Sequence, residues 1–161
     1  MTKIGKIVLT ILVLGGIFTF SAAAKEWTKE ELQDIYMEYL TDEGYRPEID
    51  KDGDIFFRVM GSNYFIIIDA ADTQFFQIYT GFKLDNLKME DAYNWANIAN
   101  RRSKVAKISL SDKDDEPDKL IVSITAELLV DTPENFYLVF ERALSLLSNA
   151  KIIFQGQLAK L

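Results

Sequence analysis

The sequence contains no histidine and no cysteine. Imidazole acid–base catalysis, Ser-His-Asp triads, thiol nucleophiles and metal sites built on histidine or cysteine are therefore excluded for this chain. The lack of cysteine also excludes disulfide bonds and the lipidated cysteine of a lipoprotein. The side chains left for chemistry are hydroxyls, amines and 25 carboxylates.

Ser148 and Lys151 match the S-x-x-K pattern of enzymes that pair a serine nucleophile with a lysine. The companion K-T-G and S-D-N motifs are absent, as are phosphate-binding loops, dinucleotide fingerprints and G-x-S-x-G. We therefore interpret the match as coincidence and predict no catalytic residues, no cofactor and no enzymatic activity. One enzymatic alternative stays open. Two of the many carboxylates could meet in a cleft, which would suit a hydrolase acting on cell-wall glycans.

Two acidic segments are candidates for binding a cation. Residues 50–54 alternate aspartates as a calcium loop does, but Gly53 is the fourth residue instead of the sixth, and Gly61 replaces the bidentate glutamate. We predict a hairpin turn centred on Asp52 and Gly53. Residues 112–118 contain five acids in seven positions. We predict a solvated hairpin loop there, with a divalent-cation site as the alternative.

Three strand-length runs between Asp54 and Thr80 form the predicted centre of the fold. They are rich in aromatic and β-branched residues, and the connections between them are too short for a crossover helix, so we expect an antiparallel meander. Residues 45–49 form a short strand interrupted by Pro47, which belongs at a sheet edge. Residues 106–111 and 120–126 alternate as a further pair of strands.

Three helices are expected around this sheet. Residues 28–43 begin with a capping box formed by Thr28 and Glu31. Residues 87–102 carry a narrow stripe of small residues, and residues 132–154 carry the strongest apolar stripe, after a Thr132-Pro133 start. The predicted fold is α+β, an antiparallel meander sheet of about five to six strands packed with three helices, in the order α-β-β-β-β-α-β-β-α.

Alternation divides the meander into two faces. The predicted core face carries Phe57, Tyr64, Ile66, Ile68, Phe76 and Ile78. The opposite face carries polar residues but is also aromatic, which is typical of a binding surface. Its predicted partner-binding residues are Phe56, Arg58, Phe65, Ile67, Phe75 and Tyr79. The alternative is that a helix or a second protomer covers this face.

Residues 1–24 have the pattern of a Sec-type signal peptide. Lys3 and Lys6 precede an apolar stretch, and Ala22-Ala23-Ala24 forms a cleavage site before Lys25. We expect residues 1–24 to be a signal peptide and residues 25–161 to be one domain, exported to the periplasm or secreted. The alternative is an uncleaved N-terminal anchor. The net charge of −7 argues against nucleic acid as a partner, and no stable membrane anchoring is expected after cleavage.

Three short motifs resemble those of the YbjN-type family, named as bacterial sensory transduction regulators, whose domain shares the fold of type III secretion chaperones. They are Gly-Asp-Ile-Phe-Phe-Arg at residues 53–58, the Trp95 helix with Asn97, Arg101 and Lys107, and Thr-Pro-Glu-Asn-Phe at residues 132–136. The resemblance spans roughly Thr28 to Phe154. Many relatives look cytoplasmic, so the signal peptide departs from the family pattern and an intracellular role does not transfer directly.

The resemblance implies a partner-binding module without catalytic residues, and a homodimer is one arrangement that it implies. Secretion chaperones hold extended client segments through apolar patches and strand addition. The predicted function is therefore a non-enzymatic, exported, chaperone-like or regulatory module that binds a protein or peptide through the aromatic sheet face and an edge strand. The alternative is a small hydrophobic-ligand-binding protein of the cell envelope, with a pocket between sheet and helices.

Overall fold

The three-dimensional structure, a computed structural model, describes residues 26–85, 87–113, 116–130 and 132–159. Three helices and six strands follow one another in these ranges, in the predicted order. They are α2 (Lys29–Asp42), β1 (Glu48–Ile49), β2 (Ile55–Val59), β3 (Ser62–Ile68), β4 (Phe75–Asp85), α3 (Met89–Arg102), β5 (Lys107–Lys113), β6 (Glu116–Leu129) and α4 (Pro133–Leu158). The α+β class and the element order are confirmed.

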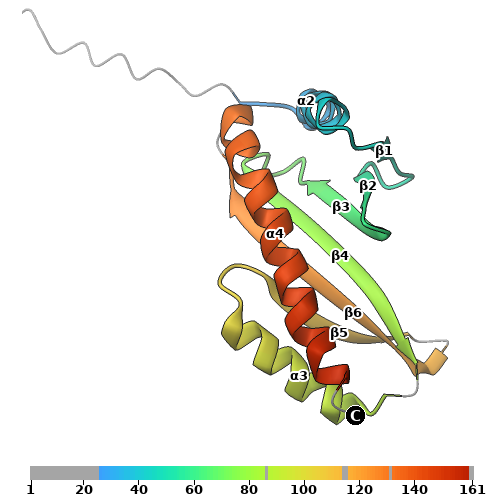
Figure 1. The fold of residues 1–161 in the computed structure, drawn as a ribbon. Helices are drawn as coiled ribbons and strands as arrows, with labels where there is room; N and C mark the ends of the chain where they lie inside the picture. Colours follow the sequence, from blue (N-terminus) through green and yellow to red (C-terminus); the bar gives the residue numbers. More distant parts are fainter. Residues whose placement is uncertain (1–25, 86, 114–115, 131, 160–161) are drawn as a thin grey trace, which may run out of the picture.

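The six strands form one antiparallel sheet with the spatial order β1-β2-β3-β4-β6-β5. The first four strands make the predicted meander, and β6 then pairs with β4 (Figure 1). β1 and β5 are left at the two edges. The segment that contains Pro47 therefore leads into an edge strand, as predicted, although only Glu48 and Ile49 pair with β2.

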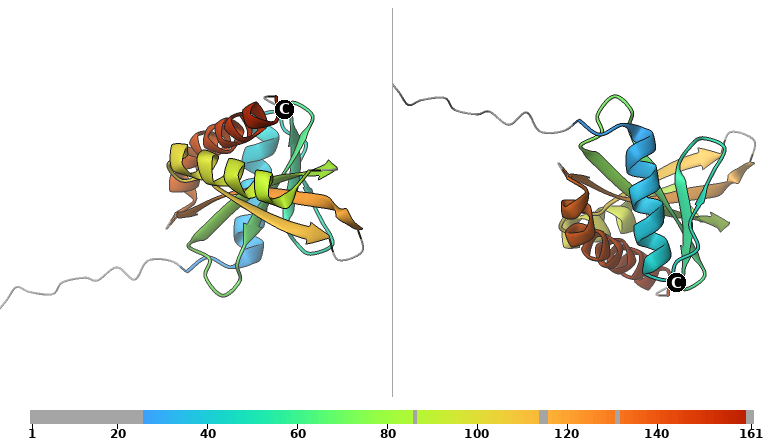
Figure 2. Two further views of the ribbon diagram at one scale, coloured as in Figure 1. Left: turned by 90° about the horizontal axis from the view of Figure 1, so that it is seen from below. Right: turned by 90° about the horizontal axis from the view of Figure 1, so that it is seen from above.

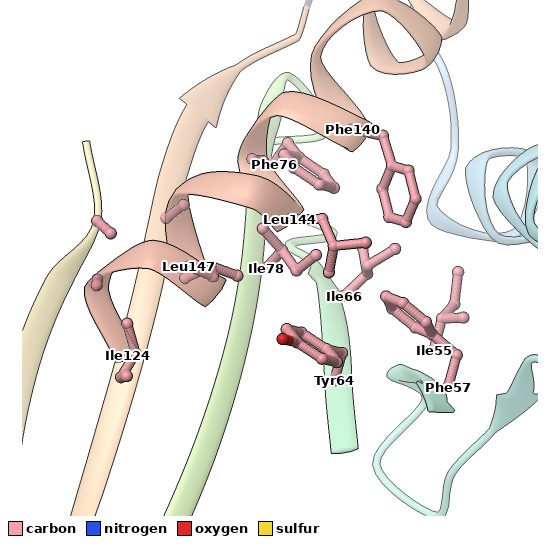
Figure 3. Packing of buried hydrophobic residues seen from close by; sticks show 14 of the residues in the cluster. Ile55, Phe57, Tyr64, Ile66, Phe76, Ile78, Ile124, Phe140, Leu144 and Leu147 are labelled. Carbon is pink, nitrogen blue, oxygen red and sulfur yellow. The ribbon is translucent and has the colours of Figure 1, made fainter. Parts of the chain in front are cut away.

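All three helices contribute buried residues to one core on one face of the sheet. Figure 3 shows the part of this core where α4 packs on the strands. The six residues predicted for the core face of the meander are buried, which confirms that assignment. α2 meets the N-terminal part of α4, where the rings of Tyr36 and Phe136 stack with centroids 3.8 Å apart. α3 meets the C-terminal part of α4, where the rings of Trp95 and Phe154 pack in a T-shaped arrangement with centroids 6.2 Å apart. Figure 2 shows α3 and α4 side by side.

Both predicted helix starts are present. The backbone N–H of Glu31 donates to Thr28 Oγ1 at 3.1 Å, and the N–H of Thr28 donates to Glu31 Oε2 at 3.0 Å. At α4, Thr132 Oγ1 accepts from the N–H of Asn135, and Pro133 occupies the first turn. These caps satisfy backbone donors that a helix cannot satisfy internally, so they fix where α2 and α4 begin.

The hairpin of β5 and β6 is longer than its apolar alternation suggested. β5 extends to Lys113 and β6 begins at Glu116, so the prediction of a solvated loop over residues 112–118 is wrong for most of the segment. The two strands pair with each other as far as Lys113 and Glu116, and this ladder supplies backbone hydrogen bonds to residues whose side chains do not favour strands. Asp114 and Asp115 lie outside the described residues.

The turn between β2 and β3 holds an unusual residue. Met60 has φ of 48° and Gly61 has φ of 78°. Two positive φ angles are the pattern of a type I′ turn, which normally takes Asn-Gly. Methionine in the left-handed region costs free energy that asparagine largely avoids. The Met60 side chain is fully exposed, so no buried contact offsets this cost.

The first prediction concerns the core. Phe140 has no exposed surface, and the centroid of its ring lies 5.7 Å from that of the Phe57 ring. We expect Phe140→Ala to lower the free energy of unfolding by about 3–5 kcal/mol, because it leaves a cavity between α4 and the sheet. Leu138 on the same helix is 77% exposed. Leu138→Ala, measured in parallel by urea denaturation, should change stability by less than about 0.5 kcal/mol.

The second prediction concerns the turn. We expect Met60→Asn to raise the free energy of unfolding by about 0.5–1 kcal/mol, because asparagine adopts the left-handed conformation more readily than methionine. Thermal and urea unfolding measure the change. A loss of stability would show that the exposed methionine makes stabilising contacts after all.

Candidate functional site

The sheet face that points away from the helices carries a row of aromatic side chains. Phe56 lies opposite Phe65, and Phe65 lies opposite Tyr79. The ring centroids of Phe56 and Phe65 are 5.2 Å apart, and those of Phe65 and Tyr79 are 4.8 Å apart with nearly parallel planes. We name Phe56, Phe65 and Tyr79 the aromatic ladder. It crosses three neighbouring strands because residues paired across a sheet point to the same face.

Arg58 extends the aromatic ladder at one side. Its guanidinium carbon lies 5.4 Å from the centroid of the Phe56 ring, within cation–π range. Its Nε donates to Asn63 Oδ1 at 3.2 Å, which holds the guanidinium over the sheet. The Arg58 side chain remains exposed. A planar cation beside stacked rings is a combination that protein interfaces favour.

The other two predicted site residues lie on the same face but farther along it. Ile67 is opposite Gln77, and Phe75 is opposite Leu129. Both are half-buried and are separate from the stacked rings. The structure thus brings four of the six predicted residues together. Leu129, which is 79% exposed, extends the apolar surface near Phe75 and was missed because the predicted strand ended at Ala126.

No helix among the described residues covers this face, because the buried side chains of all three helices belong to the core on the opposite face. One alternative, coverage by a helix, is therefore wrong for the described part of the chain. The other alternative, coverage by a second protomer, stays open. The ladder residues are half-buried by their neighbours in the sheet.

Carboxylates lie close to the aromatic ladder. The predicted turn at residues 50–54 is confirmed: Gly53 has φ of 79°, and its N–H donates to the carbonyl of Asp50. Asp50 Oδ1 accepts from the N–H groups of Asp52 and Asp54, and these hydrogen bonds hold the pKa of Asp50 below its usual range. Burial, followed by the charges of this turn, raises the pKa of Tyr79. Along the chain, Phe56 of the ladder therefore lies between an acidic turn and Arg58.

A separate cleft of about 400 Å³ lies between the β2–β3 hairpin and α4. Lys151 Nζ donates to Ser62 Oγ at 2.7 Å and lies 5.5 Å from the centroid of Phe82. Ser148 lines the same cleft. The hydroxyl that Lys151 contacts is thus supplied by Ser62 on the sheet and not by the S-x-x-K serine. The cleft combines apolar side chains with several hydroxyls, the Lys151 ammonium and the Glu141 carboxylate, so a small ligand there would meet both apolar and polar groups.

The described structure bears on only some of the remaining sequence-based hypotheses. In the ranges listed above, no three carboxylates come together as a metal site. None of the helices there is long and apolar enough to cross a membrane. Glu26 and Asp72 line one hollow, so a hydrolase with two carboxylates stays a hypothesis. The signal peptide lies outside the described residues, as does the centre of the acidic segment at residues 112–118.

The third prediction concerns pH. Tyr45 donates its hydroxyl to Glu141 Oε1 at 3.2 Å in the hairpin–α4 cleft. Burial, with the Glu141 carboxylate, raises the pKa of Tyr45 to about 12. A raised folded pKa adds stability below the unfolded value of about 10, and this stability is lost as pH rises toward 12.

We therefore expect Tyr45→Phe to be less stable than the wild type at pH 8, with the difference shrinking between pH 10 and about 12. Urea denaturation at pH 8 and at about pH 12 measures the difference in free energy of unfolding between the wild type and the variant. Tyr93→Phe, at a 56% exposed position, is the control and should match the wild type at pH 8. A difference between wild type and Tyr45→Phe that is constant with pH would contradict the assigned hydrogen bond.

Comparison with known proteins identifies the fold. No family model matches the chain, and no curated protein matches it either. Among solved structures, YbjN from E. coli, described as a candidate transcription regulator, has a TM-score of 0.60 and 16% sequence identity, covering 80% of this chain and 93% of that one. An uncharacterised protein from Methanothermobacter thermautotrophicus has a TM-score of 0.57 and 15% identity, covering 80% and 97%. The chain therefore has a YbjN-like fold, and its membership of that family stays a prediction.

Proposed function

We propose that this protein is a non-enzymatic module that binds a protein or peptide partner on the open face of its sheet. The observation that carries the proposal is the aromatic ladder with Arg58 beside it, on a face that no described helix covers. Aromatic residues and arginine supply most of the binding energy in typical protein interfaces. Contiguous apolar surface on a soluble domain is a common mark of such an interface.

The charges around the aromatic ladder indicate which kind of partner would fit it. The acidic turn at residues 50–54 lies near Tyr79, and Arg58 lies over Phe56. A partner that fits places apolar side chains on the rings, a basic group toward the turn and an acidic group toward Arg58. β1, the edge strand beside β2, has only two paired residues. A partner would therefore gain more contact from the sheet face than from adding a strand to β1.

The structural neighbour in E. coli supports a regulatory or binding role by analogy of fold, since YbjN is described as a candidate transcription regulator. The net charge of −7 opposes direct contact with DNA, whose phosphates require cationic surfaces. We therefore favour regulation through protein contacts. We also propose export of the domain to the periplasm or beyond, which rests on the pattern of residues 1–24 alone.

A second candidate function is the binding of a small hydrophobic ligand. The hairpin–α4 cleft favours it, because Lys151 and Ser62 lie there beside apolar side chains of α4 and the hairpin. An ammonium group next to apolar side chains suits a ligand with an apolar body and an anionic end that contacts Lys151 and stays clear of the Glu141 carboxylate in the same cleft. The partner-capture experiment described next separates this candidate function from the first one.

The fourth prediction tests the aromatic ladder. Tagged wild-type protein is used to capture partners from a cell-envelope extract, beside Phe56→Ser/Phe65→Ser and the single variant Arg58→Ala. A protein held by the wild type should bind the double variant at least about tenfold more weakly, and Arg58→Ala more weakly than the wild type, because both variants remove interface anchors. Tyr93→Ser/Tyr137→Ser, which removes exposed aromatics from the helices, is the matched control and should bind normally.

Circular dichroism and thermal unfolding show whether the double variant is folded. Arg58 is exposed, so Arg58→Ala keeps the test valid even if the double variant unfolds. Partner binding that survives in every variant would overturn the proposal. A recurring small molecule with no protein would favour the hairpin–α4 cleft. The mass of the purified chain reports on export, since removal of residues 1–24 leaves Lys25 as the first residue.

A further inference from the structure

The two neighbours of β6 do not cover the same length of it. β4 pairs with β6 as far as Leu129, which lies opposite Phe75. β5 pairs with β6 only between Glu116 and Thr125, since Lys107, its first strand residue, lies opposite Thr125. The last four residues of β6, Ala126–Leu129, therefore have a strand partner on one side only. Figure 1 shows this end of β6 beside α4, with the loop that precedes β5 nearby.

An unpaired stretch of strand is a template for another strand. Successive residues of a strand direct their backbone groups to opposite neighbours, so two of the four residues present N–H and C=O groups to the open side. The residues just before β5 leave the ladder. The N–H of Ser103 still donates to Ala99 at the end of α3, and residues 103–106 belong to no strand.

An apolar groove adjoins this open edge. It has a volume of about 270 Å³ and lies between the end of β6, the loop before β5 and the outer side of α4. Its apolar lining consists of Val105, Leu128, Leu138, Val139, Ala143 and Leu146. Leu138 is 77% exposed, more than any other leucine or isoleucine described on α4. A side chain from an added strand would cover it.

The groove is basic in an acidic protein. Lys104 and Arg142 are its two charged lining residues, whereas the chain carries a net charge of −7. Neither cation makes an ion pair with a carboxylate among the described residues. An occupant that complements this groove therefore has apolar groups for its floor and a carboxylate for its rim.

We propose that this groove and the open edge of β6 bind an extended peptide segment as an added strand beside Ala126–Leu129. Alternate residues of the peptide face the groove, so the recognised pattern is an apolar residue and an acidic residue two positions apart. The apolar side chain packs on Leu128 and Leu138, and the carboxylate contacts Lys104 and Arg142. This surface is separate from the aromatic ladder, so the proposal goes beyond the function proposed above.

The test uses three synthetic peptides labelled with fluorescein and amidated at the C-terminus. The first has the sequence Thr-Leu-Thr-Glu-Thr-Leu-Thr, which places leucine and glutamate on one face of a strand. The second and third carry lysine or glutamine in place of the glutamate. Fluorescence anisotropy with the purified protein should give a dissociation constant at least about tenfold lower for the acidic peptide than for the basic one. Added salt should reduce the ratio of the two dissociation constants, because it screens the charges.

Charge reversal identifies the site. Lys104→Glu/Arg142→Glu should reverse the preference, so that the basic peptide binds more tightly than the acidic one. Lys83→Glu/Lys88→Glu makes the same change in net charge at two exposed positions outside the groove and should keep the wild-type preference. Phe56→Ser/Phe65→Ser should also keep it, which separates this proposal from the one for the aromatic ladder.

Two N-methylated versions of the acidic peptide, modified at odd or at even positions, test strand addition. One version should bind at least about tenfold more weakly than the other, because only one set of amides donates to β6. Equal binding of the acidic, basic and neutral peptides would overturn the proposal, as would a charge-reversed variant with unchanged preference. Binding of oleate in the groove without any peptide binding would also overturn it, because the occupant would then be a lipid.

Discussion

The packing of α4 against one face of the sheet is the contact on which the rest of the structure depends. Its buried residues belong to the same cluster as side chains from α2, α3 and several strands, so the helix links both other helices to the sheet. Burial of this stripe removes the side chains of eight α4 residues from water, which stabilises the fold. With all three helices on that face, the other face of the sheet is left without a cover among the described residues.

This one-sided arrangement leaves open the two surfaces for which we propose binding. Neighbouring strands hold the aromatic ladder in place through their register, which requires no support from a helix. The same asymmetry operates at the end of β6, where α4 begins soon after the strand and its outer side forms one wall of the basic groove. The two surfaces differ in chemistry. One combines stacked rings with an acidic turn, and the other combines aliphatic side chains with two cations.

Much of the fold was predictable because local signals agree with the tertiary structure. The capping box at Thr28 and Glu31, the Thr132-Pro133 start and the alternation from Ile55 to Ile78 each depend on neighbouring residues in sequence, and each is present. The grouping of Phe56, Phe65 and Tyr79 on one face follows from the same alternation. Their stacking follows from strand register, which short turns restrict strongly.

What could not be predicted depends on pairing over long distances. The ends of β5 and β6 near residues 112–118 contain acids and a proline, and they are strands because β5 and β6 pair with each other as far as Lys113 and Glu116. How much of β6 is paired with β5 depends on both segments together. The open edge of β6 could therefore not be predicted from the sequence of either segment alone. Lys104 and Arg142 are 38 positions apart in sequence and belong to different elements. Only the folded chain brings them to the same groove.

The length of α4 has a consequence for how this domain unfolds. Its 26 residues extend about 39 Å and contact α2 near one end and α3 near the other. Neither of these helices can detach without exposing part of the same buried stripe, so we expect the core to open cooperatively. The short β1 strand, with two paired residues at the sheet edge, is the part that can open alone. Amide hydrogens should exchange fastest there and slowest in the middle of α4.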